Sequence, residues 1–220
     1  QAQINSVIAL YSSGQIQKAL ETVEALIKEY PNDPLLYNIN GICYKTISKL
    51  DEAVKSFEKA LAIKPDFADA HNNLGTTLKK LGQLDAAVKN YEKALAIKPD
   101  YAEAHNNLGI ALKELDQLDD AIKCFEKALS IKPDFADAHY NLGFIYQDLG
   151  QVDDSIKQYE KAVSIKLDYA EAHHNLSYLK KFTENDSQIT LMQSLLSTSD
   201  PSQSDRIHLC LALAKANEKL

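Results

Sequence analysis

The sequence predicts an all-α protein built from antiparallel helical hairpins that stack on one another. Three observations lead to this prediction: one phrase recurs with a period of 34 residues, each copy belongs to a pair of amphipathic segments, and turn residues separate those segments. The phrase reads "IKPDFADAHNNLG" from Ile63, "IKPDYAEAHNNLG" from Ile97, "IKPDFADAHYNLG" from Ile131 and "IKLDYAEAHHNLS" from Ile165. A period in this range is typical of helix pairs that stack into a curved solenoid.

The two segments of a repeat have the apolar spacing of amphipathic helices. In one repeat they cover residues 68–81 and 85–97, where apolar residues lie three or four positions apart: Leu74, Leu78 and Leu81, then Val88, Tyr91 and Leu95. Gly82 separates the two segments and suits a left-handed turn, a conformation that Asp116 can also adopt in another repeat. Pro99 should end the second helix because it has no amide hydrogen to donate.

Two further sets of residues at equivalent positions of the repeats, one of glycines and one of acids, predict how a hairpin packs and how its first helix begins. Gly75, Gly109 and Gly143 are small residues on the first helix, at places where the second helix should approach closely. Asp100 stands before a first helix and Glu103 follows three residues later, as in a capping box. We therefore expect these acids to cap the helix, and the same pattern recurs or is approximated in three other repeats.

The repeats divide the chain into an array and an extension. Residues 1–183 should form five hairpins and the first helix of a sixth, and residues 184–220 an irregular C-terminal extension. In the extension we expect a short helix at about 187–198 and a longer final helix at about 203–220, which looks like the first helix of another hairpin. The chain lacks an initiator Met and stops where a turn is expected, so we infer a fragment of a longer polypeptide.

The repeated residues resemble the tetratricopeptide repeat (TPR) family. One unit carries the pattern Leu74-Gly75, Leu78, Gly82, Ala87, Tyr91, Ala94 and Pro99, and the next unit carries Leu108-Gly109, Leu112, Ala121, Phe125, Ala128 and Pro133. Histidine stands where the family often has tryptophan. The resemblance implies a right-handed TPR solenoid whose first helices line the concave side. The chaperone-binding TPR subclass uses a clamp of Lys, Asn and Arg, which we do not expect here because acidic residues and Asn occupy its positions.

An asparagine recurs on the first helix of four repeats, at positions that should face the concave side: Asn73, Asn107, Asn141 and Asn175. Asparagine is a mediocre helix former, so four in one column need a reason. A carboxamide both donates and accepts, and a row of them can bind the backbone of an extended peptide. The column is similar to the asparagine ladder in the TPR region of O-linked N-acetylglucosamine transferase. The alternative is that each Asn bonds only within the helical scaffold.

Lysines and aromatic residues near the asparagine column are further candidates for peptide contact. Lys79 and Lys113 would form a positive rim along the groove, or would simply be solvated. Tyr140, Phe144 and Tyr178 are candidates for a side-chain pocket, because exposed aromatic residues in a groove favour partner contact. Burial in the core is the alternative for each of them.

The histidine column does not predict a metal site. His71, His105, His139 and His173 lie one repeat apart, so their rings are on the order of 10 Å apart, whereas metal ligands must converge on one ion. We expect these rings to be partly buried between stacked hairpins, with a ring nitrogen bonded to backbone or water. No cofactor is expected either.

Composition excludes several classes of partner. A net charge of −7 and a single arginine, Arg206, argue against binding to phosphate backbones of nucleic acid. No apolar run is long enough to span a membrane. Cys43, Cys124 and Cys210 lack the spacing of a zinc or redox site, and we expect them to be reduced, which fits a cytoplasmic protein.

The sequence predicts a binding module and not an enzyme. We find no nucleophile with a base, no phosphate loop and no metalloprotease motif in these residues. The expected function is a protein-protein interaction scaffold that binds an extended peptide or partner segment in its concave groove. One alternative is the recruiting arm of a larger transferase, because residues 177–220 are similar to the junction in bacterial TPR proteins that carry a sulfotransferase-like domain. Another is self-association through the C-terminal helices.

Overall fold

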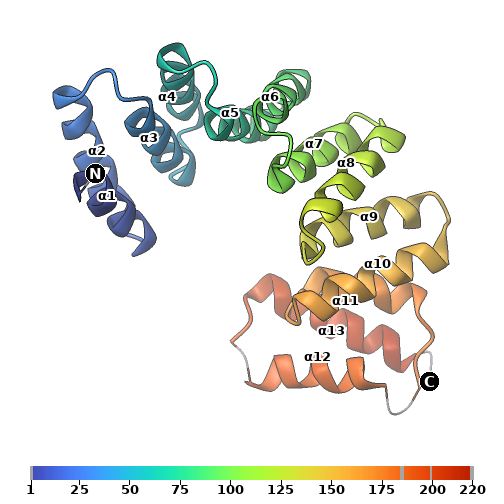
Figure 1. Ribbon diagram of the computed structural model, residues 1–220. Helices are drawn as coiled ribbons and strands as arrows, with labels where there is room; N and C mark the ends of the chain where they lie inside the picture. The colour runs from blue at the N-terminus through green and yellow to red at the C-terminus, as the bar shows by residue number, and fades with distance from the viewer. Residues whose placement is uncertain (1, 184–185, 199, 219–220) are drawn as a thin grey trace. The chain divides into compact units, whose positions relative to one another are not determined.

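The computed structural model describes residues 2–183, 186–198 and 200–218, and within these residues the protein has thirteen α-helices and no strand (Figure 1). The all-α fold class is therefore confirmed. The chain divides into two compact units, residues 1–117 and 118–220, which are described separately below. In the described part of the chain no helix combines the length and the apolar character needed to cross a membrane.

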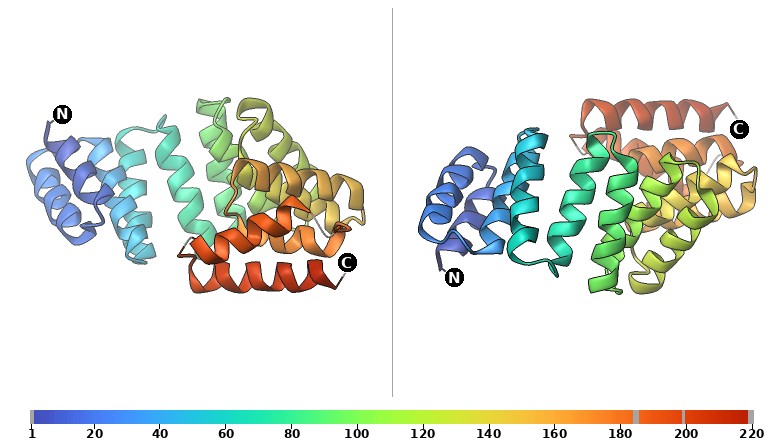
Figure 2. Two further views of the ribbon diagram at one scale, coloured as in Figure 1. Left: turned by 90° about the horizontal axis from the view of Figure 1, so that it is seen from below. Right: turned by 90° about the horizontal axis from the view of Figure 1, so that it is seen from above.

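Unit 1 contains three hairpins and the first helix of a fourth. Its helices are α1 (Ala2–Ser12), α2 (Ile16–Glu29), α3 (Pro34–Thr46), α4 (Leu50–Ile63), α5 (Ala68–Lys80), α6 (Leu84–Ile97) and α7 (Ala102–Glu114). Helices α3 and α4 pack together, as do α5 and α6, and α4 to α5 and α6 to α7 join neighbouring repeats. Successive helices of this unit therefore lie side by side in chain order (Figure 2).

Unit 2 contains α8 (Leu118–Ile131), α9 (Ala136–Asp148), α10 (Val152–Ile165), α11 (Ala170–Leu179), α12 (Ser187–Thr198) and α13 (Gln203–Asn217). Helix α13 packs closely against α11, whereas the first helices of neighbouring repeats in unit 1 make much less contact with one another. We expected α13 to resemble the first helix of another hairpin, so this close pairing is a departure. The expected boundary at residue 184 and the end of the last helix at residue 220 lie outside the described residues.

Hairpins are held together by an aromatic ring packed on a glycine. A Cβ atom at Gly75 would lie 2.8 Å from the Tyr91 ring, and one at Gly143 would lie 3.0 Å from the Tyr159 ring. Both rings are fully buried. The expected close approach of the two helices at Gly75 and Gly143 is thus confirmed, and a third glycine, Gly41 against Phe57, is equivalent.

The turn inside each hairpin uses a left-handed residue once per repeat. Gly14, Ser48, Gly82, Asp116 and Gly150 have φ angles of 76°, 60°, 75°, 60° and 72°. The prediction for Gly82 and Asp116 is confirmed.

The predicted capping box is wrong. Helix α7 begins after Tyr101, one residue later than a cap by Asp100 requires, and Tyr101 has no side-chain cap hydrogen bond. The Lys98 ammonium instead lies 4.2 Å from the centroid of the Tyr101 ring. The same stacking recurs at Lys64 on Phe67, Lys132 on Phe135 and Lys166 on Tyr169. A cation–π contact therefore stabilises the entry to each of these first helices.

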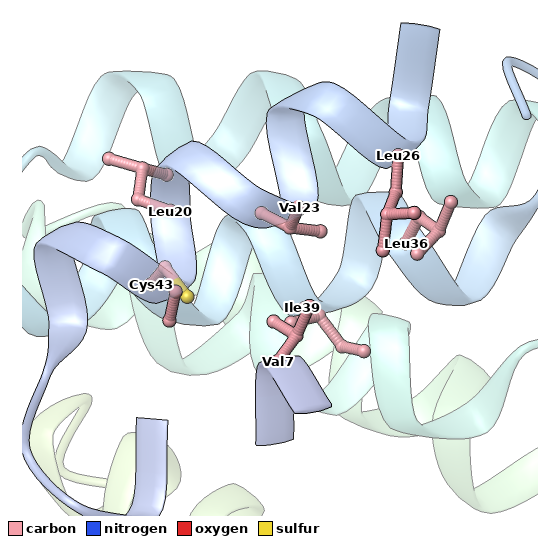
Figure 3. Close-up of a cluster of buried hydrophobic side chains, with 8 residues drawn as sticks. Val7, Leu20, Val23, Leu26, Leu36, Ile39 and Cys43 are labelled. Carbon is pink, nitrogen blue, oxygen red and sulfur yellow. The ribbon is translucent and has the colours of Figure 1, made fainter. Parts of the chain in front are cut away.

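Each unit has its own apolar core. In unit 1, Val7, Leu20, Val23, Leu26, Leu36, Ile39 and Cys43 form one cluster from α1, α2 and α3 (Figure 3). Of the three free cysteines, Cys43 is fully buried in this cluster, whereas Cys124 is half-buried and Cys210 is exposed. In unit 2, a second cluster joins α12 and α13 to the start of α11 through Ala170, Phe182, Ile189, Met192, Leu209, Ala212 and Ala216.

Candidate functional site

The asparagine column of unit 1 links one repeat to the next. The Asn73 Nδ2 donates to Asn38 Oδ1 at 3.1 Å, and Asn107 Nδ2 donates to Asn72 Oδ1 at 3.0 Å. Donor and acceptor are 35 residues apart in both bonds, so each bond joins the first helices of successive repeats. The acceptors Asn38 and Asn72 are buried, whereas Asn73 and Asn107 are half-buried.

The same position in unit 2 has different partners. The Asn175 Nδ2 donates to the hydroxyl of Tyr140 at 3.3 Å and to that of Tyr159 at 3.2 Å. Tyr140 stands 35 residues before Asn175, where the repeats of unit 1 have asparagine. Asn141 is buried. The amide nitrogens of Asn73, Asn107 and Asn175 therefore all bond to the scaffold, as the structural alternative for this column requires.

The carboxamide oxygens of the column differ from its nitrogens. Asn73 Oδ1 accepts a long hydrogen bond of 3.4 Å from the Lys45 ammonium. Among the described residues Asn107 Oδ1 has no hydrogen-bond partner, and its side chain is only half-buried. Because Nδ2 fixes the orientation of the Asn107 carboxamide, this oxygen is an acceptor held in one direction on the surface of α7.

The two lysines that we singled out are both half-buried at the ends of first helices. The Lys79 Nζ lies 3.2 Å from Glu114 Oε1, and the side chains of Lys79 and Glu114 are 24% and 41% exposed. Glu114 is 35 residues beyond Lys79, so this ion pair again links successive repeats. Lys113 is in the last turn of α7. Lys79 is therefore held in an ion pair with Glu114 of the next repeat.

The three aromatic candidates have different surroundings. Tyr140 packs in the scaffold, with its ring centroid 4.9 Å from Tyr169 and 5.7 Å from Tyr159, and burial raises the pKa of its hydroxyl. Phe144 is half-buried. Tyr178 is 49% exposed and contacts the edge of His174, with the Lys215 ammonium 5.7 Å from its ring centroid. Tyr140 thus fits the alternative of core burial better than a place in an open pocket.

The histidine column fastens each hairpin to the loop before it. Nε2 of His71 and of His139 each lies 3.0 Å from the carbonyl oxygen of the proline six residues earlier. Nδ1 of His71 lies 3.1 Å from Asn90 Oδ1 on the second helix of the same hairpin. The expectation that a ring nitrogen bonds to backbone is confirmed. In the described residues no group of three His, Cys, Asp or Glu side chains is placed to hold a metal.

The histidines also line a row of clefts that the sequence analysis missed. A cleft of about 810 Å³ lies between α4 and α6 over the start of α5, and it is lined by Glu58, Leu61, Pro65, His71, Asn90 and Ile97 among others. Equivalent positions form a cleft of about 400 Å³ around Tyr37 and, in unit 2, one of about 330 Å³ around His173. For the cleft at His71 the signal in the sequence was a polar residue 19 positions after the histidine, Asn90, which bonds to the ring and lines the same cleft.

One pair of histidines in unit 2 has buried nitrogens that lack partners. The ring centroids of His174 on α11 and His208 on α13 lie 5.3 Å apart, and neither Nδ1 has a hydrogen-bond partner in the part of the chain that the structure describes. Burial, and then the nearby His208, lower the pKa of His174. Burial also lowers the pKa of His173, although its Nε2 bonds to the Leu167 carbonyl. Burial thus favours the neutral imidazole ring at His173 and at His174.

Four models of one repeat family match the sequence. Models described as tetratricopeptide repeat match residues 1–33, 66–134 and 116–177, and a model described as TPR repeat matches residues 44–82. Together these segments cover well over half of the chain. No curated protein matches the sequence.

Several solved structures are similar to this chain. MamA is 26% identical over 74% of this chain and 95% of its own, with a TM-score of 0.65. YrrB, described as a TPR protein with an unusual peptide-binding site, is 28% identical over 79% of this chain and 89% of its own, with a TM-score of 0.63. PilW, described as a type IV pilus biogenesis factor, is 22% identical over 95% and 97% of the two chains, with a TM-score of 0.78, and is similar in fold alone. The chain belongs to the tetratricopeptide repeat family.

Proposed function

We propose that this chain is a non-catalytic scaffold that holds an extended peptide or partner segment against the first helices of unit 1. TPR proteins act as protein-interaction scaffolds, and the similar protein YrrB is described as having a peptide-binding site. In this proposal the binding surface is the exposed side of α3, α5 and α7, which we call the first-helix surface.

One observation carries the proposal: the Asn107 carboxamide is fixed by its nitrogen while its oxygen has no partner in the described part of the chain. An acceptor that is already oriented loses little rotamer freedom when it binds, so a backbone N–H of a peptide can bond to it at low entropic cost. A net intermolecular hydrogen bond of this kind contributes about 1 kcal/mol. The contact is made to the peptide backbone and so depends little on the side chains of the peptide.

The test starts from a peptide array, on which the purified protein selects a peptide whose affinity is then measured by fluorescence anisotropy. We expect Asn107→Ala to weaken binding of that peptide about fivefold. Asn72→Ala is the matched comparison, since it removes the acceptor that orients the Asn107 carboxamide but keeps the carboxamide itself available to the peptide. We expect it to lower stability with a smaller effect on affinity. Unchanged affinity in Asn107→Ala, together with lower stability, would assign the column to the scaffold alone.

A second candidate function is self-association through the C-terminal helices. Ile207 and Leu211 lie one turn apart on α13 and are 52% and 47% exposed, so an apolar strip faces solvent in unit 2. Light scattering over a concentration series tests this candidate. A concentration-dependent dimer that Leu211→Lys abolishes would support it, and a monomer at high concentration would eliminate it.

The recruiting arm of a larger transferase remains a proposal that rests on the resemblance of residues 177–220 alone. The sequence of the full-length gene product decides it, because a transferase domain after Leu220 is its only requirement.

A further inference from the structure

On the first-helix surface a lysine near the end of one first helix can pair with a residue of the next. Lys79 has a carboxylate there, whereas Lys45 does not. Lys45 and Lys79 occupy the same position of successive repeats, near the ends of α3 and α5. The residue 35 positions after Lys79 is Glu114, which forms the 3.2 Å ion pair described above. The residue 35 positions after Lys45 is Lys80. Lys45 therefore has a second cation, Lys80, at the offset where Lys79 has the carboxylate of Glu114.

Lys45 lacks a carboxylate partner in the part of the chain that the structure describes. Its side chain is half-buried, and among the described residues its ammonium donates a hydrogen bond only to the neutral oxygen of Asn73, at 3.4 Å. Burial, and then the charge of Lys80, lower the pKa of Lys45. A partly desolvated cation beside a like charge is unfavourable, and a single long hydrogen bond to an amide does not offset this.

An added carboxylate would remove this unfavourable interaction. An ammonium has three donors, and one long bond to Asn73 leaves donors of Lys45 available. Lys80 is exposed and close enough to Lys45 for its charge to act on it, so it can approach an anion bound at Lys45 from the solvent side. Coulombic attraction is stronger at a partly buried cation than at a fully solvated one, so the pair favours an anion more than two isolated surface lysines would.

We propose that Lys45 and Lys80 form a carboxylate-binding site between α3 and α5, which takes an Asp or Glu side chain of the segment bound on the first-helix surface. The site rests on the proposed function, because it adds a side-chain preference to a surface that otherwise contacts peptide backbone. The protein has a net charge of −7, so the preference is local and does not arise from attraction by the whole molecule. The site would select partner segments that place an acidic residue opposite Lys45 and Lys80.

The experiment uses a peptide array in which every peptide with Asp or Glu is paired with its Asn or Gln isostere and with a phosphoserine version. We expect the intact protein to bind the acidic member of the best pair about tenfold more tightly than its amide isostere. Lys80→Glu places a carboxylate 35 positions after Lys45, as Glu114 stands after Lys79. We expect this variant to lose the acidic preference and to unfold at a higher temperature. Lys89→Glu on α6 is the control, since it makes the same change in net charge away from the first-helix surface.

Each outcome decides the inference. Loss of the preference in Lys80→Glu but not in Lys89→Glu supports it, as does a rise in the pKa of Lys45, measured by carbon NMR of its side chain, in Lys80→Glu. Peptide binding that depends on Asn107 but shows no acidic preference overturns the site and leaves the proposed function standing. A stronger preference for phosphoserine overturns the assignment to a carboxylate. If no peptide on the array binds, both the site and the proposed function fail.

Discussion

The two units of this protein use the same repeat positions with different chemistry. In unit 1 the first helices are joined by asparagine bonded to asparagine, at Asn73 and Asn107. In unit 2 the corresponding Asn175 bonds to the hydroxyls of Tyr140 and Tyr159. The asparagine at this repeat position therefore donates a hydrogen bond to the preceding repeat in both units. Which group accepts the bond depends on the residue found in that preceding repeat. A column of identical residues does not imply a column of identical interactions.

The largest effect that we expect comes from filling the space between the two helices of a hairpin. Gly41→Ala would place a Cβ atom 2.6 Å from the Phe57 ring in unit 1, compared with 3.0 Å between Gly143 and Tyr159 in unit 2. Overpacking costs about 1–3 kcal/mol, which exceeds the gain of about 1 kcal/mol in helix propensity. Urea unfolding followed by circular dichroism should therefore show a greater loss for Gly41→Ala than for Gly143→Ala. Equal losses would show that the difference between these two distances does not determine the cost of overpacking.

A smaller effect should separate the two kinds of bond between repeats. Asn38→Ala leaves the Asn73 nitrogen without its acceptor in unit 1, and we expect a loss of about 1–2 kcal/mol. Tyr140→Phe removes one acceptor of Asn175 in unit 2 but keeps the Tyr159 hydroxyl, so we expect a loss of about 0.5 kcal/mol. Hydrogen exchange of backbone amides, read separately in the two units, measures both. A larger loss in Tyr140→Phe would reverse the comparison.

The smallest effect that we expect is a loss of stability in unit 2 under mild acid. The pKa values of His173 and His174 are lowered in the folded state, while histidine in an unfolded chain takes up its proton at about pH 6.5. The unfolded state then binds more protons, so stability falls as pH is lowered from 7.5 to 6.0. Urea unfolding at the two pH values measures the loss, and His174→Gln should reduce it. An unchanged pH dependence in this variant would show that protonation of His174 does not cause the loss.

Local features of the fold could be predicted from the sequence, because they depend on residues close together in the chain. The period of 34, the turns at Gly82 and Asp116 and the close approach at Gly75 all follow from backbone freedom and apolar spacing. The predicted start of α7 was wrong by one residue, because Lys98 stacks on Tyr101 and no side chain caps the helix there. A periodic sequence predicts that helices exist with more certainty than it predicts where each one starts.

The candidate site was less predictable, because its contacts join residues that are distant in the chain. The sequence suggested that Asn73 and Asn107 share a face, but the bond of each to the preceding repeat depends on the rise and rotation between repeats. The pairing of α13 with α11 was missed for a related reason. After residue 183 the repeat pattern is lost, and an amphipathic helix does not by itself indicate which neighbour will cover it.

The constant offset of 35 positions in the bonds of unit 1 has a consequence for how such a gene can change length. Three contacts share it: Asn73 with Asn38, Asn107 with Asn72, and Lys79 with Glu114. Duplicating or deleting one complete 34-residue module preserves the offset between successive repeats, so the protein can grow or shrink by whole modules. Inserting a single codon within a helix turns all later side chains by about 100° and breaks the match.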